Sequence, residues 1–195
     1  MCGIAGFSWE DQQLVKQMCS LIEHRGPDQH GTFTDKNASL GHRRLSILDL
    51  SENGRQPMHN EDHSIWLTFN GEIYNYKELR EKLIRSGHRF YSETDSEVII
   101  HAYEEYGENC LQYFNGCFAF AIYDSNNKKI FLARDRMGIK PLFYSLVNNN
   151  LIFASEIKSI LLCPEIKRKP YLPAVDELLT FRCNSLAKTT FQGIY

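Results

Sequence analysis

The chain has 195 residues, with 22 Lys and Arg side chains against 24 Asp and Glu, which gives a formal charge of −2 at pH 7. This balance argues against a polyanionic partner, so we expect no nucleic-acid binding. The longest apolar run, CFAFAIY at 117–123, is far shorter than the ~18 residues of a membrane span, and the start lacks a signal-peptide pattern. We therefore expect a cytoplasmic protein without membrane association, long enough to bury the core of one domain.

The first half of the chain predicts strands and amphipathic helices. A strand at 3–9 precedes a helix at 11–25, which Asp11 caps and whose buried face carries Leu14, Met18, Leu21 and Ile22. Strands are expected at 31–35, 38–47 and 64–71. Two helices follow at 75–87 and 94–107, each ending at a glycine, and the first of them has Leu79, Leu83 and Ile84 on its apolar face.

The second half begins with short apolar and aromatic runs separated by turn residues. These runs, at 117–124, 129–135, 141–146 and 151–155, predict an antiparallel meander. Helical spacing returns at 156–162 and 172–181, on either side of a basic and proline-containing stretch, KRKPYLP. Two groups of strands with helices before and after them indicate an α+β domain whose packed sheets carry helices on their outer faces.

The six cysteines are dispersed, at positions 2, 19, 110, 117, 163 and 183. They form no C-x-x-C pair and no Cys/His grouping at zinc-ligand spacing, so the sequence predicts no metal site. In a reducing compartment most of them should be small buried side chains, with Cys117 the clearest case. Cys2 differs, because removal of Met1 would make it the first residue.

A terminal cysteine combines a nucleophile with its own base. A thiol of pKa ~8.5 and an α-amine of pKa ~7.7 to 8.0 both titrate near neutrality, so the amine can take the thiol proton. Position alone does not separate this reading from a cysteine that is merely tolerated beside the initiator methionine. The rest of the sequence decides between them.

Seven motifs in the same order and spacing resemble the glutaminase domain of asparagine synthetases, within the class II, N-terminal-nucleophile glutamine amidotransferases. They are MCGIAGF (1–7), HRGPD (24–28), GHRRLSILDL (41–50), NGEIYNY (70–76), TDSEV (94–98), NGCFAFAIYD (115–124) and ARDRMGIKPLFY (133–144). The resemblance implies an Ntn-hydrolase αββα four-layer sandwich with two antiparallel sheets. It also implies a glutaminase domain at 2–166 and an interdomain connection at 167–195.

The resemblance further implies roles for single residues. Arg44 matches the arginine that holds the α-carboxylate of glutamine, a task suited to the planar fork of a guanidinium. Asn70 and Gly71 match the pair that forms an oxyanion hole. Asp95 matches the carboxylate that binds the α-ammonium, and it also stands where a helix cap is expected.

Four more positions are assigned less specifically by the same matching. Arg25 matches an arginine near the nucleophile loop, where a cation would favour the thiolate and order the site, although a turn-stabilising role is the alternative. Ile47 and Leu48 match residues whose backbone lines the pocket, and strand core is the alternative for both. Glu72 is expected to border the substrate.

Together these matches imply hydrolysis of L-glutamine to glutamate and ammonia through a Cys2 thioester. The ammonia would serve a synthetase domain or subunit, and ATP and Mg²⁺ are expected only there, because these residues contain no phosphate-binding loop. The alternatives are a glutaminase domain for another acceptor and a non-catalytic docking remnant. A homodimer is possible, and a truncated chain and a stand-alone subunit are equally compatible with the sequence.

Overall fold

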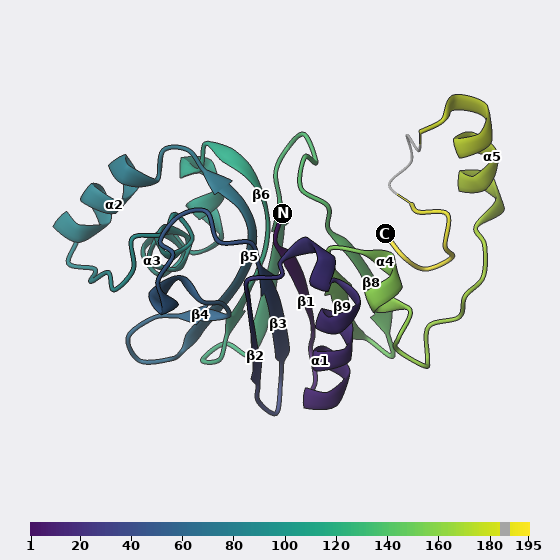
Figure 1. Cartoon of the computed structure of the whole chain (residues 1–195), viewed down its shortest axis with the longest axis horizontal. Helices are drawn as coiled ribbons and strands as arrows, with labels where there is room; N and C mark the ends of the chain where they lie inside the picture. Colours follow the sequence, from purple (N-terminus) through teal and green to yellow (C-terminus); the bar gives the residue numbers. More distant parts are fainter. Residues whose placement is uncertain (184–187) are drawn as a thin grey trace.

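Two antiparallel sheets lie face to face at the centre of the computed structural model, which describes residues 1–183 and 188–195 (Figure 1). Residues 184–187 of the expected connection lie outside the described residues. The first sheet has the order β2-β3-β1-β9-β8, with bounds Gln29–Thr34, Ser39–Arg44, Gly3–Phe7, Asn150–Ala154 and Phe143–Val147. The second has the order β4-β5-β6-β7, with bounds Met58–His59, Ile65–Ile73, Gly116–Asp124 and Lys129–Arg134.

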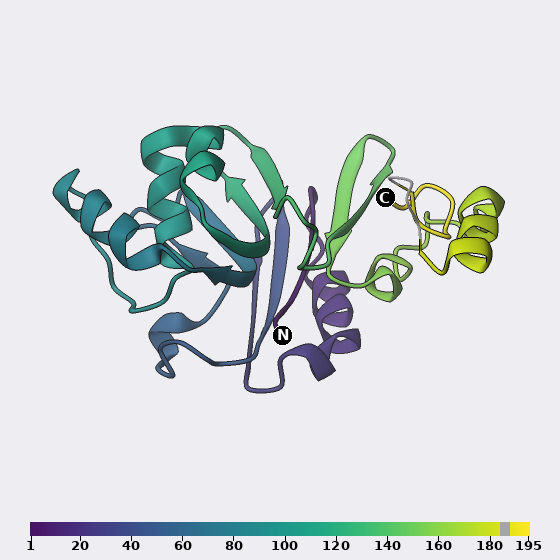
Figure 2. The same cartoon turned by 90° about the horizontal axis from the view of Figure 1, so that it is seen from above.

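Helices cover the outer face of each sheet, as the two views in Figures 1 and 2 show. The first sheet carries α1 (Gln12–Leu21) and α4 (Ile157–Ile160), and the second carries α2 (Tyr76–Arg85) and α3 (Glu97–Tyr106). Short 3₁₀ helices span Glu23–Arg25, Glu52–Gly54 and Gly107–Tyr113. The result is the expected α+β arrangement of four layers, with α5 (Leu172–Phe181) set apart at one end.

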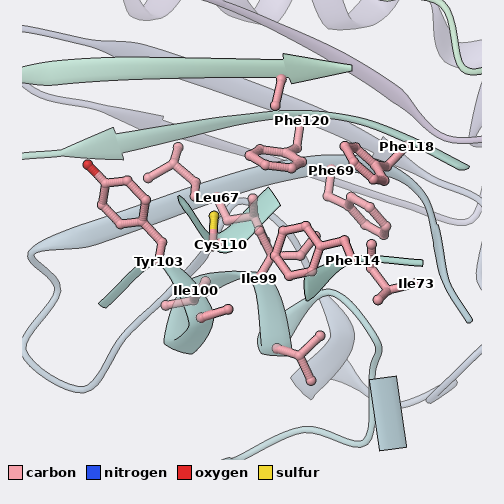
Figure 3. Packing of buried hydrophobic residues seen from close by; sticks show 14 of the residues in the cluster. Leu67, Phe69, Ile73, Ile99, Ile100, Tyr103, Cys110, Phe114, Phe118 and Phe120 are labelled. Carbon is pink, nitrogen blue, oxygen red and sulfur yellow. The ribbon is translucent and has the colours of Figure 1, made fainter. Parts of the chain in front are cut away.

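Three hydrophobic layers hold these four layers together, and β6 shows how the sequence builds them. Phe118 and Phe120 point outward into the cluster of buried side chains under α2 and α3 (Figure 3), and Ile122 belongs to the same cluster. The alternate residues Ala119 and Ala121 face the other sheet, where small side chains allow the two sheets to approach. Since both faces of β6 are covered, its run of apolar residues is continuous rather than alternating with polar ones.

The helix signals in the sequence are partly confirmed. The Asp11 carboxylate accepts a hydrogen bond from the Leu14 N–H at 2.8 Å, as expected for the cap of α1. Two side chains assigned to buried faces are wrong, because Leu21 is 40% exposed and Ile84 is 50% exposed. Each lies at the border of an apolar stripe, where helical spacing alone does not separate buried from exposed positions.

The predicted strands and helices need four further corrections. The expected meander is wrong, because β6 and β7 belong to the second sheet whereas β8 and β9 belong to the first. The strand expected to reach residue 47 ends at Arg44, so strand core is the wrong reading for Ile47 and Leu48. The two-residue strand β4 was not expected, and the helix expected at 156–162 spans only Ile157–Ile160.

The last residues return to the domain after α5. Tyr144 and Tyr195 exchange two backbone hydrogen bonds, of 3.0 and 2.9 Å, at the edge of β8, and Ile194 is only 1% exposed. By contrast, α5 presents Leu172, Leu179 and Phe181 to solvent. The role of residues 167–195 as an interdomain connection stays a prediction.

Two findings bear on the environment of the chain. No helix among the described residues is long and apolar enough to cross a membrane. All six cysteines are unpaired, and four of them are buried: Cys19, Cys110, Cys117 and Cys163. The expectation of small buried cysteines is thus confirmed for most of them, Cys117 included.

Candidate active site

The alternation of side chains along three strands brings the predicted site residues into the space between the sheets. Cys2 directly precedes β1 and shares a face with Ile4, which belongs to the layer between the sheets. On β3, Arg44 shares a face with Leu40 of the same layer. On β5, Asn70 pairs with Ala119 and therefore also faces inward.

These residues surround one small cavity, of about 50 Å³. Seven of the nine predicted site residues line it: Cys2, Arg44, Ile47, Leu48, Gly71, Glu72 and Asp95. The other two, Asn70 and Arg25, are not among its lining residues. The structure thus gathers residues from positions 2 to 95 of the sequence around a single thiol.

The thiol of Cys2 lies 3.7 Å from the backbone oxygen of Leu45. Burial raises its pKa above the ordinary value, although the Leu45 hydrogen bond, the terminal amino group and the Arg44 guanidinium all act to lower it. A buried thiol of this kind is mostly protonated at neutral pH. An attack on a carbonyl therefore needs a base close to the sulfur.

Arg25 fixes the main chain of Cys2. Its Nε donates to the Cys2 carbonyl oxygen at 2.9 Å, and its Nη1 donates to Glu156 Oε1 at 3.2 Å. Glu156 also contacts His24 at 2.8 Å and Lys158 at 3.1 Å, so one carboxylate links three basic side chains close to the N-terminus. Arg25 thus orders the backbone of the nucleophile, as predicted, and its effect on the thiolate stays a prediction.

Arg44 is 4% exposed, and its guanidinium holds the loop that follows β3. Nη2 donates to the carbonyl oxygens of Leu48 at 2.8 Å and Asp49 at 2.5 Å, and Nη1 donates to Gln29 Oε1 at 2.6 Å. A Cβ at Gly54 would lie 2.1 Å from Nη2, so only glycine leaves room for this guanidinium. The fork is therefore fixed at the cavity wall, and its binding of a carboxylate stays a prediction.

Asn70 and Gly71 are the predicted oxyanion hole, and that role stays a prediction. The Asn70 side chain is 1% exposed, and its Nδ2 has no hydrogen-bond partner among the described residues. An unsatisfied buried donor is costly and commonly marks a functional group. Gly71 lies so close to β6 that an added Cβ would be 2.4 Å from the Cys117 carbonyl oxygen.

Asp95 also lines the cavity and is not a helix cap. Its Oδ2 accepts from the Ile73 N–H at 2.8 Å, whereas the residue that caps α3 is Ser96, without a side-chain cap bond. The prediction of a capping role is therefore wrong. Burial raises the pKa of Asp95 to about 6, against the lowering effect of the Ile73 hydrogen bond. The carboxylate is ionised at neutral pH at a cost in stability.

Five cavity residues were missed from the sequence, namely Leu45, Gln56, Phe69, Thr94 and Ser96. Thr94 and Ser96 flank Asp95 in the TDSEV motif. Their position next to a predicted substrate-binding residue was the signal available in the sequence. Gln56 is 5% exposed and its Oε1 accepts from the Phe69 N–H at 2.7 Å. Nothing in the local sequence around Gln56 distinguishes it from an ordinary loop residue.

Comparison with solved structures defines the class of the fold. The chain superposes on the glutamine phosphoribosylpyrophosphate amidotransferase of B. subtilis, solved with ADP and GMP, with a TM-score of 0.69 at 21% identity. The match covers 82% of this chain and 43% of that one. The fold is therefore the α+β sandwich of the Ntn-type amidotransferases.

Sequence comparison identifies the family. The profile described as a glutamine amidotransferase domain matches residues 1–195, so the chain belongs to this family. It is 44% identical over 169 residues to asparagine synthetase [glutamine-hydrolyzing] 1 of Bacillus subtilis, covering 83% of this chain and 27% of the relative. Against asparagine synthetase 2 of the same organism, identity is 47% over 177 residues, covering 87% and 23%. The chain thus spans about a quarter of the length of these relatives.

Proposed function

We propose that this domain hydrolyses the side-chain amide of L-glutamine to glutamate and ammonia. One observation carries the proposal: a single cavity is lined by the Cys2 thiol, the Arg44 cation and the Asp95 carboxylate. A free amino acid carries one carboxylate and one ammonium group, so a cation and an anion facing one cavity provide a partner for each. The thiol beside them supplies a nucleophile for the amide.

In the proposed reaction the Cys2 sulfur attacks the amide carbon of glutamine, and the α-amine of Cys2 takes the thiol proton. Asn70 Nδ2 and the Gly71 N–H are the donors for the negative charge that develops on the amide oxygen. Collapse of this intermediate breaks the carbon–nitrogen bond, and the leaving nitrogen takes the proton from the α-ammonium and departs as ammonia. Water then cleaves the γ-glutamyl thioester, releasing glutamate and restoring the thiol.

This chemistry requires removal of Met1. While Met1 precedes Cys2, the Cys2 nitrogen belongs to a peptide bond and has no basic lone pair. Because burial raises the pKa of the Cys2 thiol, the thiol needs a base such as the free α-amine to remove its proton. We therefore propose that the active form begins at Cys2, and that a chain retaining Met1 is inactive.

The proposal extends to the use of the ammonia. Because the named relatives are glutamine-hydrolysing asparagine synthetases, we propose a synthetase domain or subunit as the acceptor, in the cytoplasm, where unpaired cysteines are the rule. Residues 167–195 would form the connection to it. This part is supported by the exposed apolar face of α5 and by a groove of about 900 Å³ next to that helix, lined among others by Leu132, Tyr144 and Leu178.

The test is a glutaminase assay of the parent and of Cys2→Ala, with the intact mass of each chain measured on the same sample. Glutamate release by the parent alone supports the proposal, and equal release by both variants overturns it. Cys19→Ala is a matched control, since Cys19 belongs to α1, is only 4% exposed and does not line the cavity. Its glutaminase activity should equal that of the parent.

A further inference from the structure

A second group of functional side chains lies on α3 and on the loop between α2 and α3. His88, His101 and Glu104 each offer one ligand atom, and these three atoms lie within 4.8 Å of one another. Glu104 Oε2 is at the centre, 2.7 Å from His101 Nδ1 and 3.4 Å from His88 Nδ1. None of the three lines the cavity around Cys2.

We propose that His88, His101 and Glu104 form a binding site for a divalent transition metal, of which Zn²⁺ is the best match. Two imidazole nitrogens and one carboxylate oxygen are a donor set that zinc uses with a further position open to water. Tetrahedral ligands about 2.1 Å from a metal are about 3.4 Å apart, which is the separation of His88 Nδ1 from Glu104 Oε2. Rotation of the Glu104 side chain would lengthen the shorter distance, the 2.7 Å between Glu104 Oε2 and His101 Nδ1.

Each polar atom that remains on the three ligands faces a polar atom of a neighbouring residue. His101 Nε2 faces Glu97 Oε1 at 3.6 Å, and His88 Nε2 faces Glu105 Oε2 at 3.2 Å. Glu104 Oε1 accepts from Asn60 Nδ2 at 2.7 Å. Carboxylates behind ligating histidines and a donor behind a ligating carboxylate are the outer contacts that orient ligands in metal sites.

Glu97 is the most deeply buried of these neighbours. Its side chain is fully buried and is held by the N–H groups of Tyr91 and Ser92, both at 2.8 Å, and by the Ser92 hydroxyl at 2.6 Å. The His101 Nε2 that it faces is buried without a hydrogen-bond partner among the described residues. This places a fixed carboxylate where it would orient a ligating His101.

The charge of the cluster also suits a cation. Glu97, Glu104 and Glu105 contribute three negative charges, whereas the two histidines are neutral when they act as ligands. A divalent ion would reduce this excess to a single negative charge. Access is available, since the side chains of His88 and Glu104 are 17% and 23% exposed.

The proposal is independent of the glutaminase reaction and is tested by zinc binding. We would titrate ZnCl₂ into a Cys2→Ala, Cys183→Ser parent by calorimetry, because partly exposed thiols bind zinc themselves. The expected result is one zinc ion per chain. His88→Ala should weaken binding at least tenfold, and Glu105→Gln, which removes only an outer carboxylate, by about ten- to a hundredfold. Co²⁺ in place of zinc should give visible absorption in the parent and lose it in His88→Ala.

His63→Ala is the matched control. The described residues contain a second close pair of histidines besides His88 and His101, because His63 stacks on His59 with ring centroids 3.8 Å apart. Its zinc affinity should equal that of the parent. Absence of zinc binding in the parent at submillimolar concentration overturns the proposal, as does equal affinity in His88→Ala. If His88→Ala does not fold, Glu105→Gln decides, and an unchanged affinity there overturns the proposal.

Discussion

Replacement of Asp95 by asparagine should stabilise the domain while impairing its use of glutamine. The side chain is 7% exposed, and burial raises its pKa from 3.8 to about 6. Asparagine has nearly the same shape and carries no charge, and its side-chain oxygen can still accept from the Ile73 N–H, now 2.8 Å from the carboxylate. The substitution therefore removes the cost of a buried charge and leaves the main hydrogen bond in place.

The sign of the effect follows from the direction of the pKa shift. Because the folded pKa lies above the unfolded one, ionised Asp95 lowers the stability of the parent as pH rises from about 4 to above 6. A rise of about two units corresponds to about 3 kcal/mol once the group is fully ionised. The gain in Asp95→Asn should accordingly be about 1.5 kcal/mol at pH 5 and about 3 kcal/mol at pH 8.

The assay is urea unfolding of both chains at several pH values, together with the Michaelis constant for glutamine. Asp135→Asn is the matched control, because Asp135 is also 7% exposed. Burial would raise its pKa, but backbone N–H groups such as those of Ile139 and Lys140 outweigh burial and lower it. That substitution should destabilise the domain by about 2 kcal/mol near neutrality, with the loss shrinking as pH falls.

The two substitutions should therefore change the free energy of unfolding in opposite directions, although the two aspartates are equally exposed. A lower stability of Asp95→Asn at pH 8, or a gain that is the same at pH 5 and pH 8, would refute the reasoning from burial. An unchanged Michaelis constant for glutamine would separately remove Asp95 from the substrate site.

Three further substitutions test the wall of the cavity. Asn70→Ala should lower kcat by about 10² to 10³ and change the free energy of unfolding by less than about 1 kcal/mol, because its Nδ2 has no partner to lose among the described residues. Glu156→Gln should loosen Arg25 and lower kcat more than it raises the Michaelis constant; equal glutaminase kinetics in the two chains would contradict this. Gly54→Ala should displace Arg44 and raise the Michaelis constant, which steady-state kinetics with glutamine would reveal.

The sequence predicted the site better than it predicted the sheets. Chemistry such as that of Cys2 and Asp95 lies within short motifs, so those residues could be found without a structure. The partition of strands between sheets depends on long-range pairing that no local pattern encodes. In β6 the alternation of phenylalanine with alanine, at 118–121, was the available sign of a strand covered on both faces, with large side chains under helices and small ones between sheets.

Hydrogen bonds between distant segments were the least predictable feature. Glu156 reaches Arg25 across 131 positions of the sequence, and the Asp49 carboxylate accepts from the Glu93 N–H across 44 positions. Likewise, His88 meets His101 only because the loop after α2 turns back onto α3. Such contacts follow from the way loops pack on the finished sandwich, so spacing along the chain gave no sign of them.

The central claim is that Cys2, once it is the first residue, forms the covalent intermediate. Acid quenching during glutamine turnover, followed by intact-mass and peptide mapping, tests this directly. The account predicts a chain that lacks Met1 and carries one added glutamyl group on its N-terminal peptide. A chain that retains Met1 yet turns over glutamine, or a glutamyl group located on any other peptide, would contradict it.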